Sequence, residues 1–241
     1  AIERDVTAQK NKELEQELIG EVSRSFNVTP DIPKTVHRLC ESIGKFGDFL
    51  FVELWAINLE RNLLRQLGHH ARDASVEGFY ERTGTVDTFQ KGEGLPGMVW
   101  DEQQTLLWSE QQVDQHFVRK EAGKTIGLHA VLGVPLMHDD NVVGVLVIGS
   151  ELSEGSLRRY RDILNHLKVQ LGSELYRKKL ESDLGHMFDT LPDIVCITDL
   201  EGRFLKVNKA FSELTGYPEN EILSSSYPVS YTHLTLPTIY S

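Results

Sequence analysis

The chain has 241 residues, of which 40% are hydrophobic and 25% charged, and this ordinary globular composition excludes a fibrous or largely disordered protein. Its 36 acidic residues outnumber the 25 basic ones and give a formal net charge of -11. Because this charge would repel a phosphate backbone, we expect no nucleic acid partner.

Neither the apolar runs nor the cysteines indicate a membrane protein or an oxidising compartment. The longest apolar run, residues 142–148, is far shorter than the ~18 residues that a membrane span requires. Cys40 and Cys196 lack metal-ligand or redox spacing. The chain begins with Ala1, and no signal peptide precedes its first helix. We therefore expect a cytoplasmic segment of a longer protein, without a membrane span of its own.

The first third of the chain predicts two helices followed by a β-hairpin. Apolar residues recur at spacings of three and four over residues 5–26, which is typical of an amphipathic helix, and again over residues 34–43. Residues 49–57 are rich in β-branched and aromatic residues and predict a strand, paired with a second extended run over residues 62–70. The more polar residues 71–90 predict only short strands.

The clearest local pattern is a pair of apolar stretches within residues 128–150, separated by the polar residues 138–141. This pattern predicts a hairpin of two long strands. Residues 142–148 show no polar alternation, so we expect a central strand that is covered on both faces.

A long helix is predicted over residues 155–190. Leu157, Leu164 and Leu171 are spaced by seven, and such a stripe buries well against a partner helix in a parallel coiled coil. We therefore expect a homodimer through parallel helices. The alternative is that the first half of this helix packs on the preceding sheet of its own chain.

The C-terminal part of the chain predicts a second small module and an unusual tail. Residues 194–198 and 204–207 predict a hairpin, followed by short helices over residues 209–215 and 218–223. Residues 224–241 contain no Asp, Glu, Lys or Arg, although a quarter of the whole chain is charged. We interpret this tail as non-native, such as translated foreign sequence.

Taken in order, these elements resemble a GAF domain over residues 19–179. The resemblance rests on the leading helix, the strand FLFVELWAI, the segment KGEGLPGMVW, the paired strands HAVLGVPLMHDDNVVGVLVI and the long closing helix. It implies an α/β (α+β) fold in which an antiparallel sheet is flanked by helices. Residues 10–26 would be a linker helix running into the leading helix, and residues 155–190 a closing and signalling helix.

Residues 187–223 resemble the N-terminal half of a PAS domain. The D-x-x-G-R turn at residues 199–203, the Val207-Asn208 strand end and the F-x-x-L-T-G-Y helix at residues 211–217 carry this resemblance. The remaining strands of that fold should follow Leu223 and are not recognisable there. We therefore expect a truncated PAS-like α+β module that is poorly stable alone.

Residues 1–9 are similar to the end of an upstream PAS domain, in which an Asp-x-Thr step, here Asp5 and Thr7, leads into a signalling helix. The resulting order of PAS end, GAF and PAS beginning is typical of two-component sensor histidine kinases of bacteria. It is also similar to that of cyclic-di-nucleotide cyclases and phosphodiesterases, and a ligand-free dimerisation scaffold is a third alternative. The resemblance implies a sensory and signal-relay segment, with Asp5, Thr7, Leu164 and Leu171 as relay residues.

The candidate ligand contacts are Phe51, Trp55 and His129. Phe51 and Trp55 lie on one side of the first strand because side chains alternate between its faces, and His129 lies at the mouth of the central hairpin. An aromatic-lined pocket would suit an unknown small ligand, although aromatic residues on a strand more often belong to the core.

Several cofactors are not expected from the residues present. The letters G-x-G-x-x-G at residues 92–97 lack the βαβ surroundings of a dinucleotide site. His69 and His70 point to opposite faces of a strand and predict no metal site. GAF domains that hold a bilin do so through a cysteine, whereas this sequence has Leu128-His129 near the pocket, so no covalent bilin is expected.

No catalytic residue is predicted. Free-methionine-sulfoxide reductases with the GAF fold need several reactive cysteines, and only Cys40 lies within the GAF-like region. The sequence contains no phospho-accepting H-E box, kinase nucleotide motif or G-G-D/E-E-F run. Phosphoryl transfer by the parent protein would therefore belong to domains outside these 241 residues.

Overall fold

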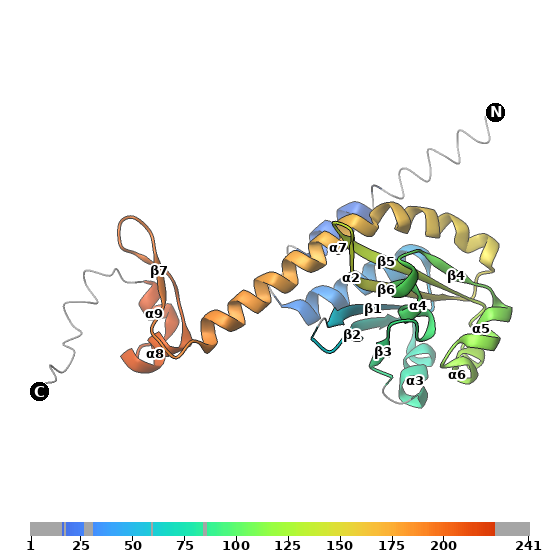
Figure 1. Cartoon of the computed structure of the whole chain (residues 1–241), viewed down its shortest axis with the longest axis horizontal. Helices are drawn as coiled ribbons and strands as arrows, with labels where there is room; N and C mark the ends of the chain where they lie inside the picture. The colour runs from blue at the N-terminus through green and yellow to red at the C-terminus, as the bar shows by residue number, and fades with distance from the viewer. Residues whose placement is uncertain (1–15, 17, 27–30, 59, 84–85, 225–241) are drawn as a thin grey trace, which may run out of the picture. The chain divides into compact units, whose positions relative to one another are not determined.

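The computed structural model describes residues 16, 18–26, 31–58, 60–83 and 86–224 (Figure 1). The predictions for residues 1–9, including the relay residues Asp5 and Thr7, lie outside the described residues, as does the predicted tail beyond residue 224. The chain divides into two units, Ala1–Lys179 and Leu180–Ser241, which are described in turn.

The first unit is built on a six-stranded antiparallel sheet with the strand order β3-β2-β1-β6-β5-β4. Its strands are β1 (Phe51–Asn58), β2 (Leu63–Ala71), β3 (Thr88–Gln90), β4 (Leu106–Trp108), β5 (Ala130–His138) and β6 (Asn141–Ser150). The hairpin predicted within residues 128–150 is β5 and β6. β6 lies between β1 and β5, which confirms that residues 142–148 form a central strand.

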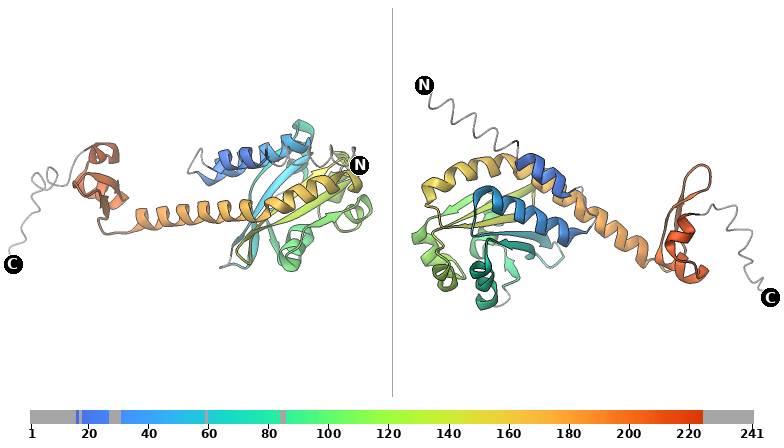
Figure 2. Two further views of the ribbon diagram at one scale, coloured as in Figure 1. Left: turned by 90° about the horizontal axis from the view of Figure 1, so that it is seen from above. Right: turned by 180° about the vertical axis from the view of Figure 1, so that it is seen from behind.

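Helices cover both faces of this sheet (Figures 1 and 2). One face packs against the helical residues 18–26, α2 (Ile32–Gly47) and the first part of α7 (Glu154–Thr190). The other face packs against α3 (Ala74–Thr83), α4 (Gly94–Glu102), α5 (Glu110–His116) and α6 (Lys120–Thr125). Because both faces are covered, alternate residues of β1 enter two separate cores. The predicted α+β fold, an antiparallel sheet flanked by helices, is confirmed.

Helix α3 corrects the prediction of only short strands over residues 71–90. The Asp73 carboxylate accepts hydrogen bonds from the backbone N–H groups of Ser75 and Val76, at 2.9 and 3.1 Å, and so satisfies the first turn of the helix. Val76 and Phe79, three residues apart, are buried against the sheet. The polar residues around this short apolar face conceal its helical period in the sequence.

Helix α7 is a single 37-residue helix whose first part belongs to the core of the first unit. Leu157, Leu164 and Leu171 are all buried there. Gly172 lies so close to β5 that a Cβ atom at this position would overlap the Met137 backbone. The three heptad leucines therefore pack on the sheet of their own chain, which is the alternative given above for the first half of this helix.

The second unit contains the end of α7 and four short elements, β7 (Cys196–Thr198), β8 (Phe204–Val207), α8 (Lys209–Thr215) and α9 (Glu219–Leu223). The Asp199 carboxylate closes the turn between the antiparallel strands, because it accepts from the backbone N–H groups of Glu201 and Arg203 at 3.1 and 2.8 Å. Asn208 caps α8 by accepting from the Phe211 N–H at 3.1 Å. The buried core is small and comprises Phe204, Val207, Phe211 and Ile222.

We predict that Gly172→Ala destabilises the first unit by about 1–3 kcal/mol, because the added methyl group overlaps backbone atoms that cannot move aside easily. Gly185→Ala is the matched control in the same helix, since a Cβ there meets no atom within 4 Å. The control should gain up to about 1 kcal/mol in helix propensity. Thermal unfolding followed by circular dichroism measures both, and equal melting temperatures for the two variants would contradict the packing described.

Candidate functional site

A buried carboxylate lies in the middle of the sheet. Glu53 is the third residue of β1, with 0% of its surface exposed, on the same side of the strand as Phe51 and Trp55. Removing an ionised carboxylate from water costs several kcal/mol unless charges and hydrogen bonds compensate it. The groups that compensate Glu53 therefore define the candidate site.

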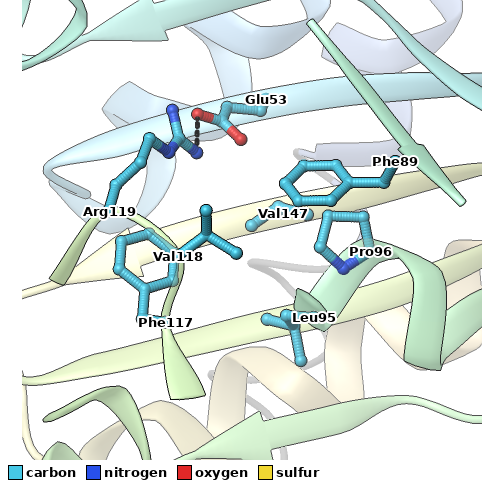
Figure 3. Close-up of a pocket in the computed structure, with 8 residues that line it drawn as sticks. All are labelled: Glu53, Phe89, Leu95, Pro96, Phe117, Val118, Arg119 and Val147. Carbon is cyan, nitrogen blue, oxygen red and sulfur yellow. Dashed lines mark hydrogen bonds and ion pairs between the residues drawn. The ribbon is translucent and has the colours of Figure 1, made fainter. Parts of the chain in front are cut away.

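Three donors from different parts of the chain converge on this carboxylate. Arg119, which precedes α6, donates from Nη2 to Oε1 of Glu53 at 2.6 Å. Tyr80 of α3 donates its hydroxyl to the same oxygen at 3.0 Å, and Trp55 donates Nε1–H to Oε2 at 3.0 Å. The side chains of Arg119 and Glu53 are 5% and 0% exposed, so this is a buried ion pair (Figure 3).

Aromatic rings surround the guanidinium group of Arg119. Its Cζ atom lies 4.7 Å from the ring centre of Phe79, and 5.8, 5.6 and 5.5 Å from those of Phe51, Tyr80 and Phe117. These distances are within the range of cation–π attraction. Within the part of the chain that the structure describes, Nε of Arg119 is buried without a hydrogen-bond partner.

A small pocket adjoins the ion pair. Its volume is about 10 Å³, which is room for about one water molecule. Figure 3 shows Glu53 and Arg119 together with the residues that line the rest of the pocket, which are Phe89, Leu95, Pro96, Phe117, Val118 and Val147. The Arg119 side chain and its neighbours fill the rest of the space beside Glu53.

The buried charge also affects the pKa values of nearby groups. Burial and the negative charge of Glu53 raise the pKa of the Tyr80 hydroxyl well above its usual value, so it remains a proton donor to the carboxylate. Burial, and then the charge of Glu53, raise the pKa of the Cys40 thiol. A buried thiol with a raised pKa holds little thiolate, which disfavours nucleophilic or redox chemistry at Cys40.

The structure places two of the three predicted ligand contacts at this site. Phe51 contacts the guanidinium group and Trp55 donates to Glu53. His129 is exposed just before β5, where its backbone N–H donates to the Ser150 carbonyl at 2.9 Å, and it is not among the residues that line the pocket. The predicted relay residues Leu164 and Leu171 lie in the core on the other face of the sheet.

Sequence reasoning missed the charged centre of the site. Glu53 carries a readable signal, because it is the only charged residue in the apolar run at residues 49–57 and alternation places it between Phe51 and Trp55. Tyr80 lies in the helix that was not predicted. Arg119 has no comparable signal, since only the tertiary fold brings it to β1.

An exposed apolar surface lies on the last part of α7. Lys178 donates from Nζ to the Phe26 carbonyl at 3.2 Å, and Lys179 donates from Nζ to the Ile57 carbonyl at 3.2 Å. Beyond these two lysines three apolar residues of the helix are exposed: Leu180, Leu184 and Met187. Their spacing of four and three residues is the heptad spacing of a coiled-coil seam.

Two family models match the chain, a GAF domain over residues 29–172 and a PAS fold over residues 182–237. No curated protein is significantly similar to the chain. Within the described residues, none of the helices is long and apolar enough to cross a membrane.

Solved GAF structures resemble the first unit at low sequence identity. The GAF domain from Acinetobacter phosphoenolpyruvate-protein phosphotransferase has a TM-score of 0.55 at 13% identity, with 72% of this chain and 98% of that chain covered. The A. aeolicus nlh2 GAF domain in an inactive state has a TM-score of 0.57 at 18% identity, with 70% of this chain and 99% of that chain covered. A free methionine-R-sulfoxide reductase from Neisseria meningitidis, in complex with its substrate, has a TM-score of 0.54 at 13% identity. The match covers 69% of this chain and 90% of that chain.

We predict that Glu53→Gln destabilises the first unit by about 3–5 kcal/mol, because it leaves the buried guanidinium group without a counter-charge. The double variant Glu53→Gln with Arg119→Met should lose less free energy of unfolding than the two single variants lose together, by about 1 kcal/mol or more. Denaturant unfolding followed by tryptophan fluorescence measures the free energy of unfolding of all three variants.

The exposed pair of Glu41 and Lys45 on α2, at 2.6 Å, is the matched control for this cycle. Glu41→Gln should change the free energy of unfolding by less than about 1 kcal/mol, because solvent screens the exposed pair. A Glu53→Gln variant as stable as Glu41→Gln would show that the charge of the buried pair is not needed.

Proposed function

The chain belongs to the GAF domain family and carries a PAS fold after its GAF domain, and we propose that it is the sensory and signal-relay segment of a larger signal-transduction protein. GAF and PAS domains are sensory modules, which supports a signal-sensing role. In this proposal the Glu53 site receives a small ligand or partner, and α7 carries the response toward the PAS fold. The order of the modules favours a cytoplasmic sensor histidine kinase as the parent protein.

One strand carries the observation on which this proposal rests. β1 contains Phe51, Glu53 and Trp55 of the candidate site, and near its end the Ile57 carbonyl accepts a hydrogen bond from Lys179 of α7. Because protein interiors are close-packed, a change in volume at Glu53 is felt by the neighbouring atoms of this strand. β1 therefore offers a direct physical route from the site to the helix.

The same helix offers the route onward. The first unit ends at Lys179, and α7 continues without a break to Thr190. We propose that two copies of the chain pair in parallel through Leu180, Leu184 and Met187, whose apolar side chains are exposed in the single chain. A coiled coil suits a relay because two helix packings can differ by only a few kcal/mol, so a modest difference in ligand affinity shifts the balance between them.

We predict that the double substitution Leu180→Glu and Leu184→Glu converts a dimer of the full chain into a monomer, because it places charges in the helix seam. Val169→Glu is the matched control, since Val169 lies on the same helix with 50% exposure against 56% for Leu184, but off the seam. Analytical ultracentrifugation measures the oligomeric state. Leu171 is unsuitable for this test, because it is part of the core and its replacement would unfold the domain.

A wild-type chain that stays monomeric at high concentration would refute the pairing. So would a double variant that remains as dimeric as the Val169→Glu control.

A further inference from the structure

Arg119 occupies what is, in its chemistry, a binding site for an organic cation. Three rings, Phe51, Phe79 and Tyr80, and the carboxylate of Glu53 come from β1 and α3, which are remote in sequence from Arg119. Aromatic faces combined with a buried carboxylate are what recognition of an ammonium or guanidinium group requires. These groups would remain as a site if the Arg119 side chain were withdrawn.

The carboxylate is held independently of Arg119. Trp55 and Tyr80 each donate a hydrogen bond to Glu53, one to each oxygen. β1 is also hydrogen-bonded to β2 on one side and β6 on the other, so Glu53 lies on an interior strand of the sheet. Arg119, in contrast, belongs to the short connection between α5 and α6, which is a less constrained position than a central strand.

Arg119 fills the site incompletely. Its Nη2 atom is paired with Glu53, but its Nε atom is buried with no acceptor among the described residues. A buried donor without a partner carries an energetic cost. A ligand whose donors were all paired would occupy the site without this cost. The displaced guanidinium group of Arg119 would then be hydrated by solvent.

Charge balance favours a cation over an anion as the ligand. An anion bound to Arg119 would place a second negative charge beside Glu53 in a buried site, where like charges disfavour each other strongly. A cation that replaces the guanidinium group leaves the buried charge unchanged. The pocket of about 10 Å³ is also too small to hold a ligand beside Arg119, so the ligand must replace this side chain.

We propose that the Glu53 site binds a small organic cation carrying an ammonium or guanidinium group, and that Arg119 is an internal occupant which this ligand displaces. The proposal rests on the sensory function proposed above and assigns the chemical class of its ligand. Withdrawal of the Arg119 side chain moves residues 117–119, so the free and bound forms differ in the connection between α5 and α6 and in the group that pairs with Glu53 of β1.

The test uses ethylguanidinium chloride at millimolar concentration as the probe, with ethylurea as its neutral analogue and sodium chloride as the salt control. Arg119→Ala removes the internal occupant from the full chain. We expect ethylguanidinium to raise the melting temperature of this variant in a saturable manner, because a ligand that binds only the folded state stabilises it. The wild-type chain should need a concentration higher by about tenfold or more, since its site is mostly occupied by Arg119.

A second variant removes the carboxylate as well. The double variant Glu53→Gln with Arg119→Ala should lose the response to ethylguanidinium, because it keeps the cavity but not the counter-charge. An equal response of this double variant, or an equal response to ethylurea, would overturn the proposal. No response of a folded Arg119→Ala variant would overturn it as well.

Arg119→Met covers the case in which Arg119→Ala does not fold, because it retains an apolar stem of similar length. Refolding of Arg119→Ala by ethylguanidinium would support the proposal. Absence of refolding together with no shift for a folded Arg119→Met variant would overturn it. If ethylguanidinium has no effect but the chains still pair through Leu184, the proposed ligand class is wrong and the proposed relay function is unaffected. The two failures are therefore distinguishable.

Discussion

The charge of Glu53, fixed at the centre of a buried sheet, is the constraint on which the first unit depends. A carboxylate with no exposed surface must be matched by donors, and the chain supplies them from three places: Trp55 in the same strand, Tyr80 in α3 and Arg119 before α6. The hydrogen bonds that satisfy this one charge tie α3 and the connection between α5 and α6 to β1.

Helix α7 has two roles that are separated along its length. Up to Lys179 one row of buried apolar residues and Gly172 fit the sheet, and Lys178 and Lys179 donate to the carbonyls of Phe26 and Ile57. Beyond Lys179 the apolar side chains of Leu180, Leu184 and Met187 are exposed. The strand that carries the buried charge is therefore also tied to the helix just before its exposed seam begins. This arrangement gives the proposed relay a short path, through β1 and a single lysine contact.

The sequence allowed the fold to be predicted better than the site. The continuous apolar run at residues 142–148 and the residue types at 49–57 identified the central strands, because propensity and burial act in the same direction there. The heptad of Leu157, Leu164 and Leu171 was ambiguous, since a sheet and a partner helix bury the same stripe equally well. Phe51 and Trp55 were found from strand alternation, whereas Arg119 reaches Glu53 only across 66 residues of chain. Such long-range pairing of charges leaves no local pattern.

The claim that β1 joins the Glu53 site to α7 is tested most directly by hydrogen exchange of the full chain, followed by mass spectrometry, in the wild type and in Arg119→Met. Exchange reports local opening free energies along the backbone. If β1 transmits the change, peptides covering residues 55–58 and 175–190 should exchange faster or slower in the variant, together with those around residue 119. A change confined to residues 110–125, with β1 and α7 as protected as in the wild type, would contradict the connection between site and helix.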